Sequence, residues 1–195
     1  MIKSKKDYLF YLNEDKIALG IKKSSITSKI KLTIYPDYIY KFQCILRKVE
    51  YYKNCKKDGI FNKIVSALIY YRFQKLSVKL GFSIPTNVFG PGLSIVHYGT
   101  IIVSHNASIG ANCRIHADTN IGASGGSSKA PKLGNNVYIA PGVKIFGDIS
   151  IPNNTALGAN SVVNKSFIKE GTLIAGIPAK VIKNIDIRDI IKHIV

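Results

Sequence analysis

The sequence predicts a mainly β protein in which a parallel β-helix follows an α-helical N-terminal region. Two observations predict this fold class. Aliphatic residues recur at six-residue intervals in the C-terminal part, and three segments of the first 80 residues carry the start and stop signals of helices. We expect a basic helical region over residues 1–82, the β-helix over residues 83–183 and a short C-terminal helix over residues 184–195.

The three helical segments are bounded by proline, aspartate and glycine. The first, DYLFYLNEDKIALG, ends on Gly20; the second, PDYIYKFQCILRKVEYYKNCKK, opens with Pro36 and Asp37; the third, IFNKIVSALIYYRFQKLSVKLG, closes on Gly81. Glycine readily takes the left-handed conformation that ends a helix. Because aromatic residues at helical spacing belong more often to a core than to a ligand platform, we expect these helices to pack against the rest of the protein.

The β-helix is predicted by an internal repeat of six residues. An α-helix of 3.6 residues per turn cannot keep such a stripe on one face, whereas a parallel β-helix can, with three hexapeptides in each triangular coil. The aliphatic positions, which we expect inside, are Val103, Ile109, Ile115, Ile121, Leu133, Ile139, Ile145, Ile151, Leu157 and Val163. Mostly small or β-branched residues follow four positions later, at Ala107, Cys113, Thr119, Val137, Val143, Ile149, Thr155 and Ser161.

One aliphatic step is missing, near residue 127. The surrounding segment, ASGGSSKAP over residues 123–131, has the glycine and serine content of a loop that leaves the coil and rejoins it at Leu133. Loops that project from a solenoid often carry function, so we expect this excursion to lie near a site.

The cysteines and the hydropathy indicate a reducing compartment. The three cysteines form no CxxC pair, and Cys113 falls on an inward position, where we expect a core residue rather than a nucleophile. The basic N-terminus lacks an uninterrupted apolar core of a signal peptide, and no apolar stretch approaches the ~20 residues of a membrane-spanning helix. We therefore predict a cytoplasmic protein.

The net charge of +17 is concentrated in the N-terminal region. Residues 1–80 carry 18 Lys and Arg against 6 Asp and Glu, and residues 81–195 carry 10 against 5. Such a surface attracts polyanions, whether nucleic acid, anionic lipid headgroups or phosphorylated small molecules, or it serves solubility alone.

Three of the four histidines lie in the stretch SIVHYGTIIVSHNASIGANCRIH. Because one coil holds ~18 residues, His97 and His116 are expected to be neighbours on adjacent coils. His116 and His105 should point outward. Histidine is the side chain best suited to take a proton near neutral pH, so a cluster on one outer face suggests base chemistry.

The direction of His97 depends on the register of the first coil. Strict counting back from Val103 places His97 at an inward position, where an imidazole would lose hydration. We predict a register slip between Gly99 and Val103 that turns His97 outward, and the neighbouring glycines supply the backbone freedom for it.

The hexapeptide run, the segment GLSIVHYGT, the excursion ending in APKLG and the closing IAGIPAKVI resemble the left-handed β-helix (hexapeptide-repeat) acyltransferases. The similarity covers roughly residues 84–183. It is strongest to the branch of serine acetyltransferases and of the O-acetyltransferases of bacterial polysaccharide synthesis. The left hand of the coil is implied by this resemblance alone.

The resemblance implies transfer of an acetyl group from acetyl-CoA to a hydroxyl, with no metal. His97 matches the catalytic histidine of the family and would act as general base, and His116 would be a second base or an acceptor-site residue. Threefold association is natural for a three-sided rod, so we expect a homotrimer with sites between subunits.

The coenzyme contacts implied by the family fall on small and basic residues. Ala140, Gly142 and Ala159 match the small residues beside the pantetheine arm, although repeat geometry alone also explains them. Lys165 and Lys180 match the basic residues near the phosphates, although lysines on a solvated surface would look the same.

Three departures from the serine acetyltransferase pattern led us to expect another acceptor. Val96 stands where those enzymes have an aspartate, Ala130 where they have a histidine, and SIPTN lacks the upstream carboxylate; Asp118 could replace it. We therefore predict a sugar acceptor of capsular or exopolysaccharide synthesis. A lipid-linked oligosaccharide would bring the basic N-terminal region into peripheral contact with the inner membrane face, and we expect no nucleic-acid partner.

Three alternatives remain open. The first is serine O-acetyltransferase of cysteine biosynthesis. The second is a γ-type carbonic anhydrase, whose zinc is bound by three histidines between subunits. The third is a non-catalytic, membrane-associated scaffold, which would keep its binding activity after a His97→Ala substitution.

Overall fold

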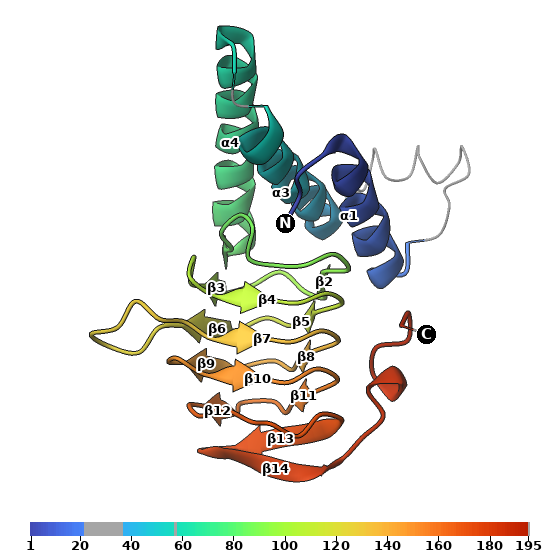
Figure 1. The fold of residues 1–195 in the computed structure, drawn as a ribbon, viewed down its shortest axis with the longest axis vertical. Coiled ribbons are helices and arrows are strands. Elements are labelled where there is room, and N and C mark those ends of the chain that lie inside the picture. Colours follow the sequence, from blue (N-terminus) through green and yellow to red (C-terminus); the bar gives the residue numbers. More distant parts are fainter. Residues whose placement is uncertain (22–36, 57, 195) are drawn as a thin grey trace.

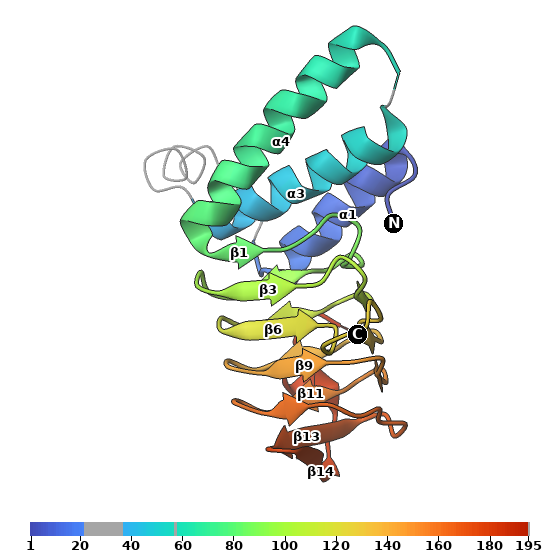
Figure 2. The same ribbon diagram turned by 90° about the vertical axis from the view of Figure 1, so that its left-hand side faces the viewer.

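A computed structural model describes residues 1–21, 37–56 and 58–194. The helices α1 (Lys5–Ala18), α3 (Tyr38–Cys55) and α4 (Ile60–Leu80) lie at one end of a column of stacked β-coils (Figure 1). Viewed from the side, each coil lies directly beneath the one before it (Figure 2). The last helix ends at Leu80, and the first strand begins at Phe82.

Each helix begins or ends where the sequence signals indicated. The Ser4 hydroxyl accepts from Asp7 N (3.0 Å) at the start of α1, and the Asp37 carboxylate accepts from Ile39 N (3.0 Å) at the start of α3. Gly81 ends α4 with φ of 77°, which confirms it as the C-cap. Among the described residues, none of the helices combines the length and the hydropathy that crossing a membrane requires.

The coils form three sheets, one on each side of the column. Their orders are β1-β3-β6-β9-β12, β10-β7-β4 and β14-β13-β11-β8-β5-β2. Every pair is parallel except β13 with β14. The strands are β1 (Phe82–Ser83), β2 (Ser94–Ile95), β3 (Ile101–Val103), β4 (Ser108–Ile109), β5 (Arg114–Ile115), β6 (Thr119–Gly122), β7 (Lys132–Leu133), β8 (Tyr138–Ile139), β9 (Lys144–Phe146), β10 (Ser150–Ile151), β11 (Ala156–Leu157), β12 (Val162–Val163), β13 (Thr172–Gly176) and β14 (Ala179–Asn184).

The interior of the column consists of the predicted aliphatic residues. All ten are at most 5% exposed, and the eight small or β-branched residues that follow them are also buried. Between β6 and β7 the chain leaves the column as a projecting loop (Figure 1), at the position of the predicted excursion. The six-residue repeat therefore reports the inward face of each short strand.

An asparagine ladder runs along one corner of the column. Asn112, Asn136 and Asn154 have φ of 55–56°, a left-handed conformation that asparagine tolerates. Asn112 Nδ2 donates to Asn136 Oδ1 (2.9 Å), and Asn136 Nδ2 donates to Asn154 Oδ1 (2.8 Å). Asn154 Nδ2 then donates to a carboxylate oxygen of Glu170 (3.3 Å), which ends the ladder.

The C-terminal part differs from the expectation in two ways. The segment 172–184 forms an antiparallel hairpin rather than a further parallel strand, because the turn after Gly176 sends β14 back along β13. Where a short helix was expected over residues 184–195, the structure has only the three-residue 3-10 helix Ile187–Asp189. The strand β14 occupies the chain up to Asn184, and Asp186 caps the 3-10 helix. The buried Ile191 follows shortly after it.

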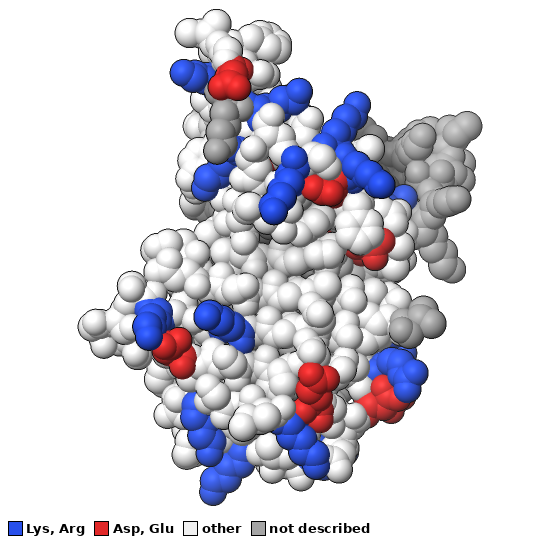
Figure 3. All heavy atoms as spheres, in the orientation of Figure 1, with Lys and Arg blue, Asp and Glu red and all other residues white. Residues whose placement is uncertain are grey.

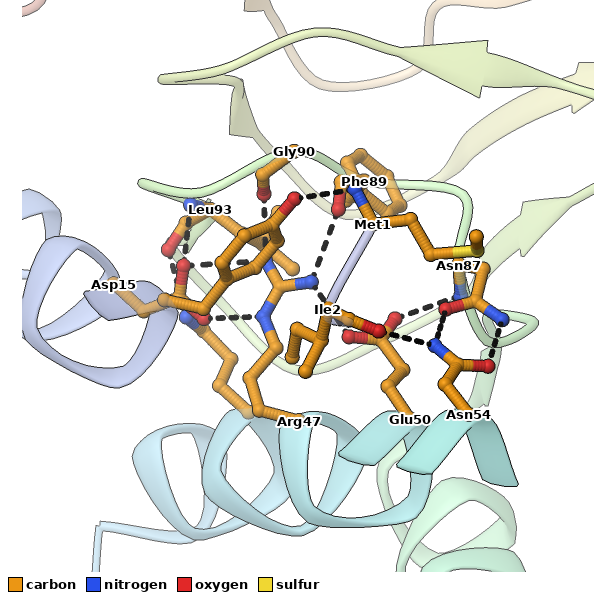
Figure 4. A network of polar contacts seen from close by, with 12 residues as sticks. Met1, Ile2, Asp15, Arg47, Glu50, Asn54, Asn87, Phe89, Gly90 and Leu93 are labelled. Atoms are coloured by element: carbon orange, nitrogen blue, oxygen red, sulfur yellow. Dashed lines mark hydrogen bonds and ion pairs between the residues drawn. The ribbon is translucent and has the colours of Figure 1, made fainter. Parts of the chain in front are cut away.

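A buried polar network joins the helices to the first coil (Figure 4). Arg47 of α3 is fully buried, and its guanidinium pairs with Asp15 of α1 (2.8 Å) and with Glu50 (3.0 Å). It also donates to the carbonyl oxygens of Phe89 (3.0 Å) and Gly90 (2.7 Å). Because buried charges need partners, these contacts fix the helices on the end of the column.

Gln43 of α3 completes the edge of the sheet that begins with β2. Its Nε2 donates to Leu93 O (2.7 Å), and its Oε1 accepts from Ile95 N (3.2 Å). The side-chain amide thus takes the place of a neighbouring strand at an edge whose backbone groups would otherwise be buried without partners.

Candidate active site

His97 and His116 lie side by side at one corner of the column. Strand β2 pairs with β5 so that Ile95 is opposite Ile115, and each histidine follows its strand by one or two residues. The two ring centroids are 6.0 Å apart, and the ring planes are inclined by 57°. This confirms that the two histidines are neighbours on adjacent coils.

His97 is exposed because the first coil contains extra residues. Ile95 is opposite Ile115, but the next paired residue is Ile101, opposite Thr119, so the segment 96–100 is longer than its counterpart. The outward direction of His97 is confirmed. The slip lies between Ile95 and Ile101, so it overlaps the predicted span from Gly99 to Val103 only at Gly99 and Thr100.

His116 is half-buried, and its environment disfavours the charged form. Burial lowers its pKa, and the positive charges of Arg114 and of His97, when protonated, lower it further. Its ring meets the ring of Tyr138 edge to face, with centroids 5.2 Å apart. Within the described part of the chain, its buried Nε2 has no hydrogen-bond partner. A neutral imidazole with a free nitrogen can accept or donate one hydrogen bond.

His105 does not join the pair. It follows β3, whose Val103 is opposite Ile121, so it lies at the next corner, where the excursion begins. Among the described residues, no group of three or more His, Cys, Asp or Glu side chains is placed to hold a metal ion. Within one chain, His105 is therefore not placed to share a metal ion with His97 and His116.

Cys113 belongs to the core, as expected. It is 1% exposed, and burial raises the pKa of its thiol. A buried thiol in apolar surroundings is a poor nucleophile.

The small residues matched to the coenzyme follow the histidine corner down the column. His116 N donates to Ile139 O, and Ala140 N donates to Leu157 O, so Ala140 lies directly below His116. Gly142 and Ala159 belong to the same corner. Gly142 has φ of 78°, and a Cβ there would collide with the side chain of Asn160, so the turn itself also requires glycine.

The two lysines lie at different corners. Lys180 of β14 is opposite Ala175, which continues the histidine corner on the last coil. Lys165 follows β12 and lies at the corner from which the excursion leaves, with its ammonium group 5.7 Å from the Phe167 ring. Within one chain, the structure brings Lys180 but not Lys165 to the histidine side.

Asp118 is held by another partner. Its carboxylate pairs with Lys144 Nζ at 2.8 Å, and its φ of 59° belongs to the corner turn. In the described residues its side-chain hydrogen bonds are with Lys144 rather than with His97, so the orienting carboxylate expected from the sequence is not at hand.

The comparisons in sequence and in structure both find serine acetyltransferases. No family model matches. A serine acetyltransferase of Staphylococcus aureus is 34% identical over 106 residues, which are 53% of this chain and 49% of that protein. One of Staphylococcus epidermidis is 36% identical over 101 residues, 51% of this chain and 47% of that protein. The match thus spans about half the length of these relatives.

Solved structures match nearly the whole chain. Serine acetyltransferase from Brucella abortus has a TM-score of 0.68 at 22% identity, covering 93% of this chain and 71% of that one. Its complex with coenzyme A has a TM-score of 0.69 at 23% identity, covering 93% and 70%. The chain has the left-handed β-helix fold of these serine acetyltransferases. The predicted fold class is thereby confirmed.

One prediction, that of the acceptor, is wrong. We expected a sugar acceptor of capsular or exopolysaccharide synthesis, but both the relatives in sequence and the neighbours in structure are serine acetyltransferases. The comparisons give no support to the membrane contact predicted with that acceptor either.

Two residues beside the histidines were not among the predicted site residues. Arg114 and Tyr138 lie opposite each other on β5 and β8, on the same outer face as His116. Each directly precedes an inward aliphatic residue, which is a position that varies freely in the repeat. That they lie beside His116 is visible only from the way in which β5 pairs with β8.

Proposed function

We propose that the chain is a serine O-acetyltransferase, which moves the acetyl group of acetyl-CoA onto the hydroxyl of L-serine in cysteine biosynthesis. The observation that carries the proposal is the pair of His97 and His116, 6.0 Å apart, in a chain whose relatives of 34% and 36% identity are serine acetyltransferases. Solved serine acetyltransferases of the same fold include complexes with coenzyme A and with cysteine.

His97 is the general base. It takes the proton of the serine hydroxyl while the oxygen attacks the carbonyl carbon of the thioester. When the carbon–sulfur bond breaks, the protonated His97 returns the proton to the leaving thiolate. Acetyl-serine and coenzyme A result, and the base is neutral again. No covalent enzyme intermediate is needed.

His116 assists from the adjacent coil. Burial keeps its pKa below the ordinary value, so its ring is uncharged when the proton arrives on His97. A second positive charge at 6.0 Å would oppose that proton transfer.

Arg114 binds the carboxylate of serine. It lies on the same outer face as His116 and makes no ion pair within the described residues. A pocket of about 190 Å³ adjoins it, lined also by Ser94, Val96 and the acidic Asp37. Arginine is suited to a carboxylate because its planar fork donates two parallel hydrogen bonds.

The coenzyme lies along the corner below the histidines. Ala140, Gly142 and Ala159 leave space beside the backbone for the pantetheine arm, and Lys180 meets phosphate at the last coil. Lys165 lies at another corner of the same chain, so it reaches the coenzyme only from a neighbouring subunit. A homotrimer would supply that neighbour, and exposed apolar side chains such as Tyr98 (72%) and Ile177 (74%) favour association.

The experiment is release of the coenzyme A thiol from acetyl-CoA by the purified protein. L-Serine should support release, and His97→Ala should lower kcat/KM by about 100-fold to 10,000-fold. His105→Ala is the matched control, because His105 is an exposed histidine at the next corner, and it should leave the rate unchanged. If L-serine supports no release above the rate without acceptor, the proposal fails.

Arg114→Gln separates binding from chemistry. The variant should raise KM for L-serine by about tenfold, the equivalent of ~1.4 kcal/mol, while KM for acetyl-CoA stays unchanged. Initial rates at varied concentrations of each substrate measure this. Equal effects on both substrates would contradict the role given to Arg114.

A further inference from the structure

A groove between α3 and α4 lies apart from the acetyl-transfer site. Its volume is about 400 Å³, which is within the usual range of ~300–1,000 Å³ for small-molecule sites. Lys and Arg side chains are spread over this helical part of the molecule (Figure 3). The residues that line the groove are Lys41, Ile45 and Lys48 of α3, and Ile69, Arg72, Lys75, Leu76 and Lys79 of α4.

The groove carries five cationic side chains and no carboxylate. The helix α4 contains no Asp or Glu, and the single acid of α3, Glu50, is buried against Arg47 and Asn87 N. Within the described residues none of the five makes an ion pair. Like charges three or four residues apart destabilise a helix, and Arg72, Lys75 and Lys79 have this spacing. A bound anion would therefore reduce the repulsion between these three side chains.

Two of the cations are held in place by aromatic rings. Lys79 Nζ is 4.2 Å from the centre of the Tyr38 ring, and Lys75 Nζ is 4.9 Å from the centre of the Tyr71 ring. Such contacts restrict the lysine side chains before any ligand arrives, which lowers the entropy that binding must cost.

The floor of the groove is apolar. Ile69 and Leu76 are 8% and 7% exposed, and Ile45 is half-buried between the two α3 lysines. The helices α3 and α4 run in opposite directions (Figure 2), and each contributes one row of cations to the lining of the groove. Each row spans seven residues, about 10 Å at 1.5 Å per residue. An elongated anion matches the rows, and a flat apolar group matches the floor.

We propose that this groove binds a small molecule that joins a polyphosphate to an apolar ring, of which a nucleoside polyphosphate is the simplest example. Lysine and arginine recognise phosphate oxygens by charge-assisted hydrogen bonds. A second copy of the same groove does not fit, because it carries the same charge.

Calorimetric titration of the full chain with ATP tests the site, at about 150 mM salt so that weak surface attraction is screened. Inorganic triphosphate and adenosine are the comparison ligands. ATP should bind with a micromolar dissociation constant, triphosphate about tenfold more weakly, and adenosine without measurable heat. Arg72→Gln with Lys75→Gln should weaken ATP binding by at least about tenfold.

The matched control is Lys5→Gln with Lys63→Gln, which removes the same charge from two exposed lysines outside the groove. It should leave ATP affinity within about twofold. Equal weakening by both pairs, no heat with ATP at millimolar concentration, or tighter binding of a short oligonucleotide than of ATP overturns the proposal. Equal affinity for triphosphate and ATP overturns the role of the apolar floor. The acetyl-transfer rate without ATP is unaffected in either pair, so the result is independent of the proposed function.

Discussion

At the scale of single residues, neighbours decide what a side chain can do. His116 and His105 are both outward histidines of the same repeat. His116 lies on the strand face beside Arg114 and Tyr138, whereas His105 is exposed at a corner. The repeat pattern locates both of them, but it contains nothing about this difference.

The lowered pKa of His116 makes stability depend on pH. Its pKa in the folded chain lies below the ordinary 6.5, so on acidification the unfolded chain binds a proton before the folded chain does. Protonation therefore favours unfolding, and stability should fall as the pH drops below about 6.5. His193 contributes in the same direction.

Urea unfolding at pH 7.5 and pH 5.5 measures this effect. His116→Gln should narrow the difference in unfolding free energy between the two pH values, because its side chain does not titrate. His105→Gln, at an exposed position, should leave that difference as it is in the wild type. An unchanged difference in the His116 variant would refute the argument.

Gln43 shows how one helix residue supports the first coil. Gln43→Leu removes the two hydrogen bonds that the side-chain amide makes with the backbone of the edge strand. Leu93 O and Ile95 N are then buried without hydrogen bonds. Each such group costs ~1–3 kcal/mol, so the free energy of unfolding measured by urea titration should fall by about 2–6 kcal/mol. The exposed Gln74→Leu, which loses a bond to the Tyr70 hydroxyl, should cost less than about 0.5 kcal/mol.

At the scale of elements, the attachment of the helices rests on buried charge. Arg47→Met would leave Asp15 and Glu50 buried without their cation, which costs about 3–5 kcal/mol. Arg188→Met breaks the exposed pair with Asp186 and should cost at most about 1 kcal/mol. Thermal and urea unfolding of both variants would measure the contrast. A similar loss of unfolding free energy in both variants would mean that the buried network does not add to stability.

The strands of the column could be predicted from the sequence because each repeat buries the same position. The slip before Ile101 was placed only approximately, since several glycines allow it. The hairpin of β13 and β14 was missed because aliphatic residues continue on both sides of its turn. The partners of Arg47 were also missed, because charged residues on a basic helix suggest an exposed face rather than an interface.

The candidate site could be predicted in part. Counting residues per coil brought His97 to His116, since that distance depends on the repeat alone. Asp118 was assigned to His97 by elimination, but its corner position places it beside Lys144. A contact between side chains of different coils depends on the register in which their strands pair. A single sequence reveals that register only where the repeat is regular.

At the scale of the whole molecule, a single chain presents only one wall of the proposed site. Sedimentation equilibrium should give three times the chain mass of 21.4 kDa, because a neighbouring subunit is needed to bring Lys165 to the coenzyme. Lys165→Gln should then raise KM for acetyl-CoA while leaving KM for L-serine unchanged. A monomer with full activity would contradict this assembly.

The asparagine ladder gives the column a modular length. Every rung repeats the same amide-to-amide bond, and only the last rung, to Glu170, is different. If a coil in the middle of the column were duplicated, its asparagine would find the same amide partners on the coils above and below. The number of turns can therefore change during evolution without rebuilding either end, and the reach between the histidines and the last lysine would change with it.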